Sequence, residues 1–108
     1  MIKTLPSCGP TCVPRTDPIA SVDHVVALKA LAHLDRLRVF FHLVQAGEPL
    51  PAYAMQRALA LPGPTLSHHL DQLERAGLID RERHERCIYS SVRRDLVADL
   101  VRLLTACC

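Results

Sequence analysis

The sequence predicts a single, mainly α-helical domain that carries one small β-hairpin. The chain has 108 residues, and chains divide into several domains only above about 250–300 residues, so one hydrophobic core is expected. Hydrophobic residues make up 49% of the chain but aromatic residues only 4%, which indicates a core of Leu, Val and Ala side chains. Most apolar residues recur at helical spacing, and one short arginine-rich segment is typical of paired strands.

The charge and the cysteines limit the classes of function. A net charge of +2 is too small to indicate a nucleic-acid partner by itself and too balanced for a disordered chain. The five cysteines are an odd number, and the chain starts without the apolar segment of a secretion signal. We therefore expect reduced thiols and a cytoplasmic protein. No apolar run approaches the ~18 residues that a membrane span requires.

Residues 1–18 are expected to form a flexible N-terminal arm, followed by a folded domain over residues 19–108. Proline lacks the backbone donor and biases the preceding residue away from helix, so an extended chain results. Prolines recur in the arm at a four-residue spacing, at Pro6, Pro10, Pro14 and Pro18.

The first helix is expected over residues 22–32, with Ser21 as its N-cap. Its side chains are apolar around most of the circumference, so the helix requires two surfaces that bury it. The first of these surfaces is the core of the same chain, and the simplest candidate for the second is another protomer.

A second helix is expected to be capped by Asp35 and to end at Gly47, ahead of two prolines. Its apolar residues follow the i, i+3, i+4, i+7 spacing of a core-facing stripe. The residues of this stripe are Leu37, Phe40, Phe41 and Val44.

A short helix over residues 52–60 and a longer one that runs to Ala76 are joined by a tight turn. In this turn Gly63 is expected to adopt a cap conformation and Pro64 to take the first position of the next helix, which Gly77 ends. The longer helix carries an apolar stripe at Leu66, Leu70 and Leu73. Its outward face carries polar side chains at Thr65, Ser67, His68, Gln72 and Arg75.

Residues 78–83 and 86–90 are expected to pair as a hairpin around His84 and Glu85, and a last helix covers residues 93–106. The hairpin is rich in arginine, at Arg81, Arg83 and Arg86. The last helix has a wide apolar stripe at Leu96, Val97, Leu100, Val101 and Leu104.

This order of elements predicts a winged helix-turn-helix. The polar helix can enter the major groove of DNA and present donors and acceptors to base edges, while the hairpin arginines reach phosphates or the minor groove. Taken alone, arginines on a ribbon indicate only its solvated face. Combined with the turn and the polar helix, they favour DNA binding.

Two stretches of the chain resemble the ArsR/SmtB family of small metal-responsive repressors. The stretch 30–38, Ala-Leu-Ala-His-Leu-Asp-Arg-Leu-Arg, is similar to the family signature where its first two core helices meet. Residues 64–79 are similar to its recognition helix and the entry to its wing. With Ile88, Tyr89 and the last helix, the resemblance covers residues 22–108.

The resemblance implies a homodimer that forms through the first and last helices and binds operator DNA. His69 is then expected on the core side as a satisfied histidine. Asp71 differs from the family pattern, because a carboxylate beside the DNA-facing positions would repel phosphate. We expect it to pair with Arg75, one helical turn further on. The DNA-facing positions implied by the family are Thr65, Ser67, His68 and Gln72.

The cysteines point to the effector. Other sites of the family require thiols near residues 48–53 or a histidine near Asp95, and the sequence has neither there. The ending Cys107-Cys108 instead resembles an arsenic-responsive branch in which a vicinal pair follows the last helix. Trivalent arsenic and antimony are soft, thiolate-seeking centres, whereas a disulfide between neighbours is strained. The resemblance therefore implies a repressor of arsenical resistance that arsenite, methylarsenite or antimonite releases from DNA.

Inorganic arsenite requires a third thiolate, for which the sequence offers Cys8, Cys12 and Cys87. Cys87 is expected to be a small buried strand residue. We therefore expect Cys107 and Cys108 to bind the metalloid, and Cys8 or Cys12, from the same or the other protomer, to complete the site.

Another sensor chemistry on the same fold stays open. The thiols could sense Cd, Pb or Zn, or two distant cysteines could form a disulfide as a redox switch. An enzyme is not expected, because the chain has no GxGxxG motif, no CxxC beside a strand-helix unit and no set of nucleophile, base and orienting residue.

Overall fold

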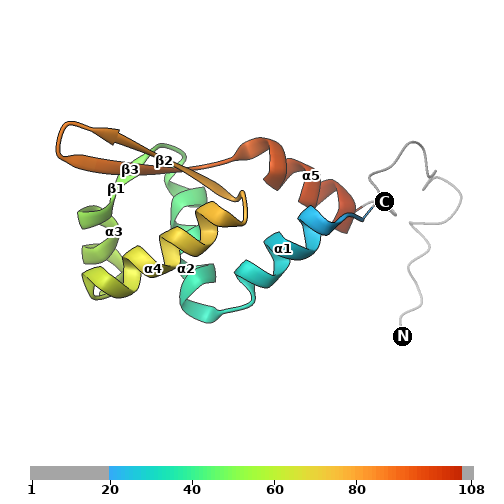
Figure 1. The fold of residues 1–108 in the computed structure, drawn as a ribbon, viewed down its shortest axis with the longest axis horizontal. Coiled ribbons are helices and arrows are strands. Elements are labelled where there is room, and N and C mark those ends of the chain that lie inside the picture. The colour runs from blue at the N-terminus through green and yellow to red at the C-terminus, as the bar shows by residue number, and fades with distance from the viewer. Residues whose placement is uncertain (1–19, 106–108) are drawn as a thin grey trace, which may run out of the picture.

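The computed structural model describes residues 20–105, which form five α-helices and a three-stranded antiparallel sheet (Figure 1). In chain order the elements are α1 (Val22–Leu31), α2 (Leu34–Ala46), β1 (Leu50–Pro51), α3 (Ala52–Leu59), α4 (Gly63–Arg75), β2 (Ile79–His84), β3 (Cys87–Val92) and α5 (Arg94–Leu104). The mainly helical fold with a small hairpin is confirmed. The expected arm, residues 1–18, lies outside the described residues. Within the described range, each helix is too short or too polar to cross a membrane.

The hydrophobic core lies where α2, α3 and α4 meet the base of the sheet. The predicted stripe of α4 is confirmed, because Leu66, Leu70 and Leu73 are at most 3% exposed. Helix α4 therefore turns one face into the core and leaves its polar faces outside. The side chains with less than 2% exposure include Val39, Leu43, Met55, Leu66, Leu73, Leu78 and Ile79.

The predicted core face of α2 is wrong at most of its positions. Its buried residues are Val39, Phe40 and Leu43. Its exposed apolar residues are Leu34, Leu37, Phe41 and Val44. Helix α2 carries apolar residues on two faces, and helical spacing alone does not decide which of them meets α4.

The helix ends agree with the sequence in part. Ser21 caps α1, since its Oγ accepts the backbone N–H of His24 at 3.4 Å. Asp35 does not cap α2: His33 occupies the N-cap position without a side-chain hydrogen bond, and the Asp35 carboxylate accepts from Arg38 at 3.0 Å. Gly47 ends α2 with a φ of 70°, as expected.

The turn between α3 and α4 differs from the prediction. Gly63 and Pro64 are the first two residues of α4, so Gly63 does not provide the cap conformation. The left-handed residue is Ala60, with a φ of 56°, at the end of α3. The turn is made before the Pro-Gly-Pro segment, which starts the next helix.

The hairpin pairs as β2 and β3, in register from Ile79 with Val92 to His84 with Cys87. It turns at Glu85 and Arg86, one residue later than predicted, and Glu85 has a positive φ of 59°. Strand β1 was not predicted. It pairs with the outer edge of β3, and a two-residue strand that contains a proline leaves no periodic signal.

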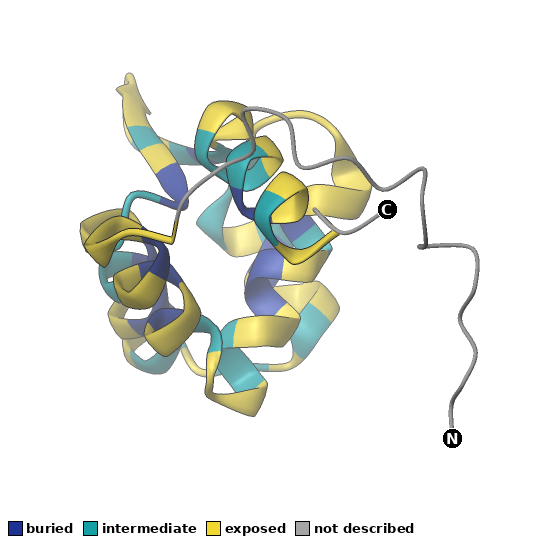
Figure 2. Ribbon diagram, turned by 90° about the vertical axis from the view of Figure 1, so that its right-hand side faces the viewer, coloured by how far each residue is buried: buried dark blue, intermediate teal, exposed yellow. Residues whose placement is uncertain are grey.

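Helices α1 and α5 lie at the end of the domain opposite the hairpin tip, where the His24–Asp99 hydrogen bond joins them (Figure 1). Only Leu100 of the predicted α5 stripe is buried, and Val101 and Leu104 are 52% and 66% exposed. The start of α5 packs closely on Gly77, where an added Cβ would lie 3.4 Å from a methyl carbon of Leu96. Figure 2, viewed onto this end, shows exposed residues along both helices.

Candidate nucleic-acid interface

Helix α4 is the second helix of the helix-turn-helix, and its core stripe fixes which of its residues face outward. Of the residues expected to face DNA, Ser67, His68 and Arg75 are exposed. Thr65 and Gln72 are half-buried. All five therefore lie on α4, and three of them are exposed.

The hairpin places its arginines in two different environments. Arg83 near the end of β2 and Arg86 in the turn are exposed. Among the described residues, neither takes part in an ion pair. The Arg81 side chain, by contrast, is only 21% exposed and contacts α4.

Arg81 lies in a cluster of charged residues that joins β2 to α4. Its Nε and Nη2 donate to the same carboxylate oxygen of Glu74, at 2.9 and 2.7 Å. Nη2 also donates to Asp71 at 3.2 Å. The other oxygen of Asp71 pairs with Arg75 at 3.2 Å, so the predicted pairing of Asp71 with Arg75 is confirmed. We call Asp71, Glu74, Arg75 and Arg81 the Arg81 cluster.

His69 lies on the core side of α4, as expected, but it is not satisfied. It is 5% exposed, and its Nδ1 has no hydrogen-bond partner among the described residues. Its ring packs 5.0 Å from that of His33, centroid to centroid. Burial lowers the pKa of His69, and the neighbouring His33 and Arg36 lower it further. The neutral imidazole is therefore the form that fits this site.

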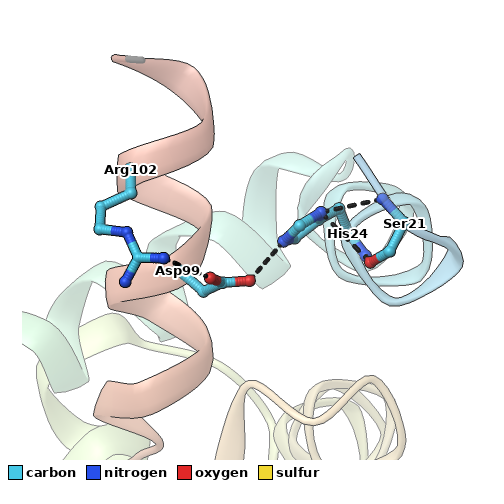
Figure 3. A network of polar contacts seen from close by, with 4 residues as sticks. All are labelled: Ser21, His24, Asp99 and Arg102. Atoms are coloured by element: carbon cyan, nitrogen blue, oxygen red, sulfur yellow. Dashed lines mark hydrogen bonds and ion pairs between the residues drawn. The ribbon is translucent and has the colours of Figure 1, made fainter. Parts of the chain in front are cut away.

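A polar link that was not predicted joins α1 to α5 (Figure 3). The Ser21 backbone N–H donates to Nδ1 of the buried His24 at 3.1 Å. Nδ1 must then be an acceptor, which places the ring proton on Nε2. Nε2 lies 2.7 Å from Asp99 and donates to it, and the other carboxylate oxygen of Asp99 accepts from Arg102 at 3.3 Å.

The predicted metalloid ligands Cys8, Cys12, Cys107 and Cys108 lie outside the described residues. Cys87 is half-buried on β3 with a free thiol, rather than fully buried as expected. Within residues 20–105 no three His, Cys, Asp or Glu side chains are arranged to hold a metal ion.

The Arg81 cluster and the pair His24–Asp99 each join two different elements of the fold, α4 with β2 and α1 with α5. The acidic residues of the cluster, three positions apart on α4, carried a local signal: they share one helix face. Nothing in the sequence indicated that the face would meet β2. The pair His24–Asp99 spans 75 positions and had no signal of this kind.

Comparisons with known proteins agree with this geometry. Residues 31–82 match a family model described as a helix-turn-helix domain. The transcriptional repressor PagR of Bacillus anthracis is 30% identical, with 77% of this chain and 93% of that chain covered and a TM-score of 0.63. The transcriptional regulator HlyU of Vibrio vulnificus CMCP6 is 30% identical, with 74% and 81% covered and a TM-score of 0.62.

A third solved structure, Mb0332 from Mycobacterium bovis, is described as a homodimeric winged helix-turn-helix DNA-binding domain and a possible ArsR-family regulator. It is 27% identical, with 76% of this chain and 74% of that chain covered and a TM-score of 0.65. No curated protein sequence gave a significant match. The chain belongs to the HlyU- and PagR-type transcriptional regulators, and it shares the winged helix-turn-helix fold with a solved structure described as a possible ArsR-family regulator.

Proposed function

We propose that this chain is a repressor that binds operator DNA as a homodimer and is released by trivalent arsenic. The observation that carries the DNA-binding part is the exposed polar face of α4 beside a hairpin whose tip carries the exposed Arg83 and Arg86, which make no ion pair within residues 20–105. Arg83 and Arg86 would neutralise phosphates. The residues that would reach base edges or sugars in the major groove are Thr65, Ser67, His68, Gln72 and Arg75.

Dimer formation through α1 and α5 is supported by the apolar side chains that these helices leave in solvent. Large exposed apolar areas on a protein surface often mark contacts with another protein. Covering them with a second copy would hold two α4 helices at a fixed separation, which a palindromic operator with half-sites about one helical turn apart requires. The exposed residues are Val22, Val25, Val26 and Leu28 of α1 and Val101 and Leu104 of α5.

The arsenic response is supported by the chemistry of the cysteines and by their place in the sequence. Cys107 and Cys108 would supply two thiolates, and Cys8 or Cys12 a third for inorganic arsenite. Both pairs flank the helices assigned to the dimer contact. A new covalent link there would change the spacing of the α4 helices, and a coupling of ~1–3 kcal/mol would weaken DNA binding by about five- to 150-fold.

A gel shift tests the DNA-binding part. Wild-type protein is expected to prefer a duplex from the promoter upstream of its own gene over random duplex at ~150 mM salt, with affinity that falls steeply as salt rises. Equal affinity for the two duplexes would refute the repressor function.

The same assay tests the effector when arsenite, methylarsenite, antimonite, cadmium or zinc is added. Arsenite is expected to release wild-type protein but not Cys107→Ser/Cys108→Ser, while Cys87→Ser serves as the matched control and responds as wild type does. Unchanged release of Cys8→Ser/Cys12→Ser would exclude the arm thiols. Release by cadmium or zinc alone, or by a thiol oxidant alone, would replace arsenic with one of the other sensor chemistries.

A further inference from the structure

We propose that Arg81 is a positioning residue of the DNA-binding site: it fixes the hairpin against α4 and masks two carboxylates, and it does not contact phosphate. This inference rests on the proposed DNA-binding function and assigns one arginine of that site a different role from its neighbours. Its basis is the Arg81 cluster, in which one guanidinium serves two acidic side chains of α4.

The geometry of Arg81 is that of an internal contact. Two of its nitrogens donate to one oxygen of Glu74, and Nη2 is shared with Asp71, with all three distances between 2.7 and 3.2 Å. Hydrogen bonds between charged groups at such distances are about twice as strong as neutral ones. The side chain is 21% exposed, so water screens these bonds less than it screens a surface pair.

The carboxylates that Arg81 neutralises lie on a sensitive face of α4. Ser67, Asp71 and Glu74 follow the i, i+4, i+7 spacing of a single helical stripe. Ser67 on this stripe is exposed and assigned to DNA. Without Arg81, Glu74 would be uncompensated and Asp71 would be paired with Arg75 alone, so the negative charge of this stripe would repel the phosphates that flank the groove.

A phosphate contact by Arg81 would carry its own penalty. To reach a phosphate, the guanidinium would have to leave both carboxylates. Glu74 would then lose the one ion pair it makes among the described residues, and Asp71 would keep only its pair with the exposed Arg75. Arg83 lies two positions further along β2 and has no ion pair among the described residues. It can bind phosphate without such a loss and is therefore the matched control for Arg81.

The test is a double-mutant cycle on binding to the upstream promoter duplex, measured by fluorescence anisotropy over a range of salt concentrations. The variants are Arg81→Gln, Glu74→Gln, the double variant and Arg83→Gln. Arg81→Gln is expected to weaken binding about five- to tenfold, because it leaves Glu74 unpaired and Asp71 paired with Arg75 alone. In the Glu74→Gln background the same change is expected to cost less than about threefold, since one of those carboxylates is already neutral.

The salt dependence of binding distinguishes a positioning role of Arg81 from a direct contact with phosphate. Losing one phosphate contact lowers the slope of log K against log salt by about 0.9, which is expected for Arg83→Gln. Arg81→Gln is expected to keep the wild-type slope. Arg81→Lys retains the charge but not the forked donor geometry, so it is expected to weaken binding although it could still serve a phosphate.

Three results would overturn the proposal: equal costs of Arg81→Gln in the two backgrounds, a slope reduced as in Arg83→Gln, or wild-type affinity of Arg81→Lys. Thermal melting of every variant shows whether it is folded, and Arg81→Lys carries the test if Arg81→Gln is not. Failure of the proposed function has a different signature, because wild-type protein would then show no preference for the promoter duplex over random duplex.

Discussion

Truncation of Asp99 to alanine is expected to loosen α5 from α1 and lower the stability of the domain. The His24 ring is 3% exposed, and the Ser21 N–H occupies its Nδ1. Within residues 20–105, the acceptor of the proton on Nε2 is Asp99, 2.7 Å away. Removal of the carboxylate leaves a buried donor without its acceptor.

The loss of stability expected for Asp99→Ala depends on how far His24 and Asp99 are each buried. A buried polar group left without a partner costs about 1–3 kcal/mol. The Asp99 side chain is 40% exposed, so water can enter part of the space that the truncation opens. We therefore expect a loss of about 1–2 kcal/mol, or roughly 5–10 °C in Tm for a folded domain of this size.

The assay is thermal unfolding followed by circular dichroism at one fixed protein concentration, because the Tm of a dimer depends on concentration. Asp99→Asn keeps an amide oxygen that accepts from Nε2, so it is expected to lose less than half as much. Arg102→Ala removes only the exposed partner of Asp99 and is expected to cost at most about 1 kcal/mol. The reasoning is refuted if Asp99→Ala melts within about 2 °C of wild type, or if Asn and Ala are equally damaging.

Three further predictions concern the backbone, the buried histidine and the dimer. Glu85→Gly and Ala60→Gly each remove a side chain from a left-handed residue, so each is expected to stabilise the domain by about 1 kcal/mol in urea unfolding; a loss of stability would contradict this. His69 has a lowered pKa in the folded state, so the unfolded chain takes up a proton first as the pH falls. The stability of the wild-type protein is therefore expected to decrease below about pH 6.5, the pKa of histidine in the unfolded chain. His69→Phe is expected to weaken this pH dependence when urea unfolding is measured above and below about pH 6.5. Val101→Asp places a charge on the exposed face of α5 and is expected to convert the proposed dimer to a monomer in sedimentation velocity; a dimer of unchanged stability would place the contact elsewhere.

The features that could be predicted from the sequence are those that neighbouring residues decide. The Ser21 cap needs only the backbone N–H three positions on, and the core stripe of α4 needs only apolar residues at helical spacing on one face. Both are confirmed. The order of elements that predicts a winged helix-turn-helix is likewise a property of consecutive segments, and it is confirmed by the fold.

The error in α2 has a different cause. Leu37 and Val39 are both apolar and lie two positions apart, so they occupy different faces of the helix. Only the packing of α2 against α4 and the sheet decides that Val39 is buried and Leu37 is exposed. For a helix with two apolar faces, the sequence therefore predicts the length of the helix but not which face is buried.

The role of a charged residue is also decided by tertiary contacts. Arg81 and Arg83 occupy alternate positions of one strand and share a face of the ribbon, so the sequence presents them as equivalent basic side chains. The fold brings the Arg81 position against the acidic stripe of α4, while Arg83 extends beyond it toward the hairpin tip. The positive charge available to DNA is therefore concentrated at the tip, and the arginine nearest to α4 balances the acidic residues of that helix. A modest net charge of +2 is consistent with DNA binding on this account, because the local arrangement of free arginines, and not their total, determines the field that a phosphate meets.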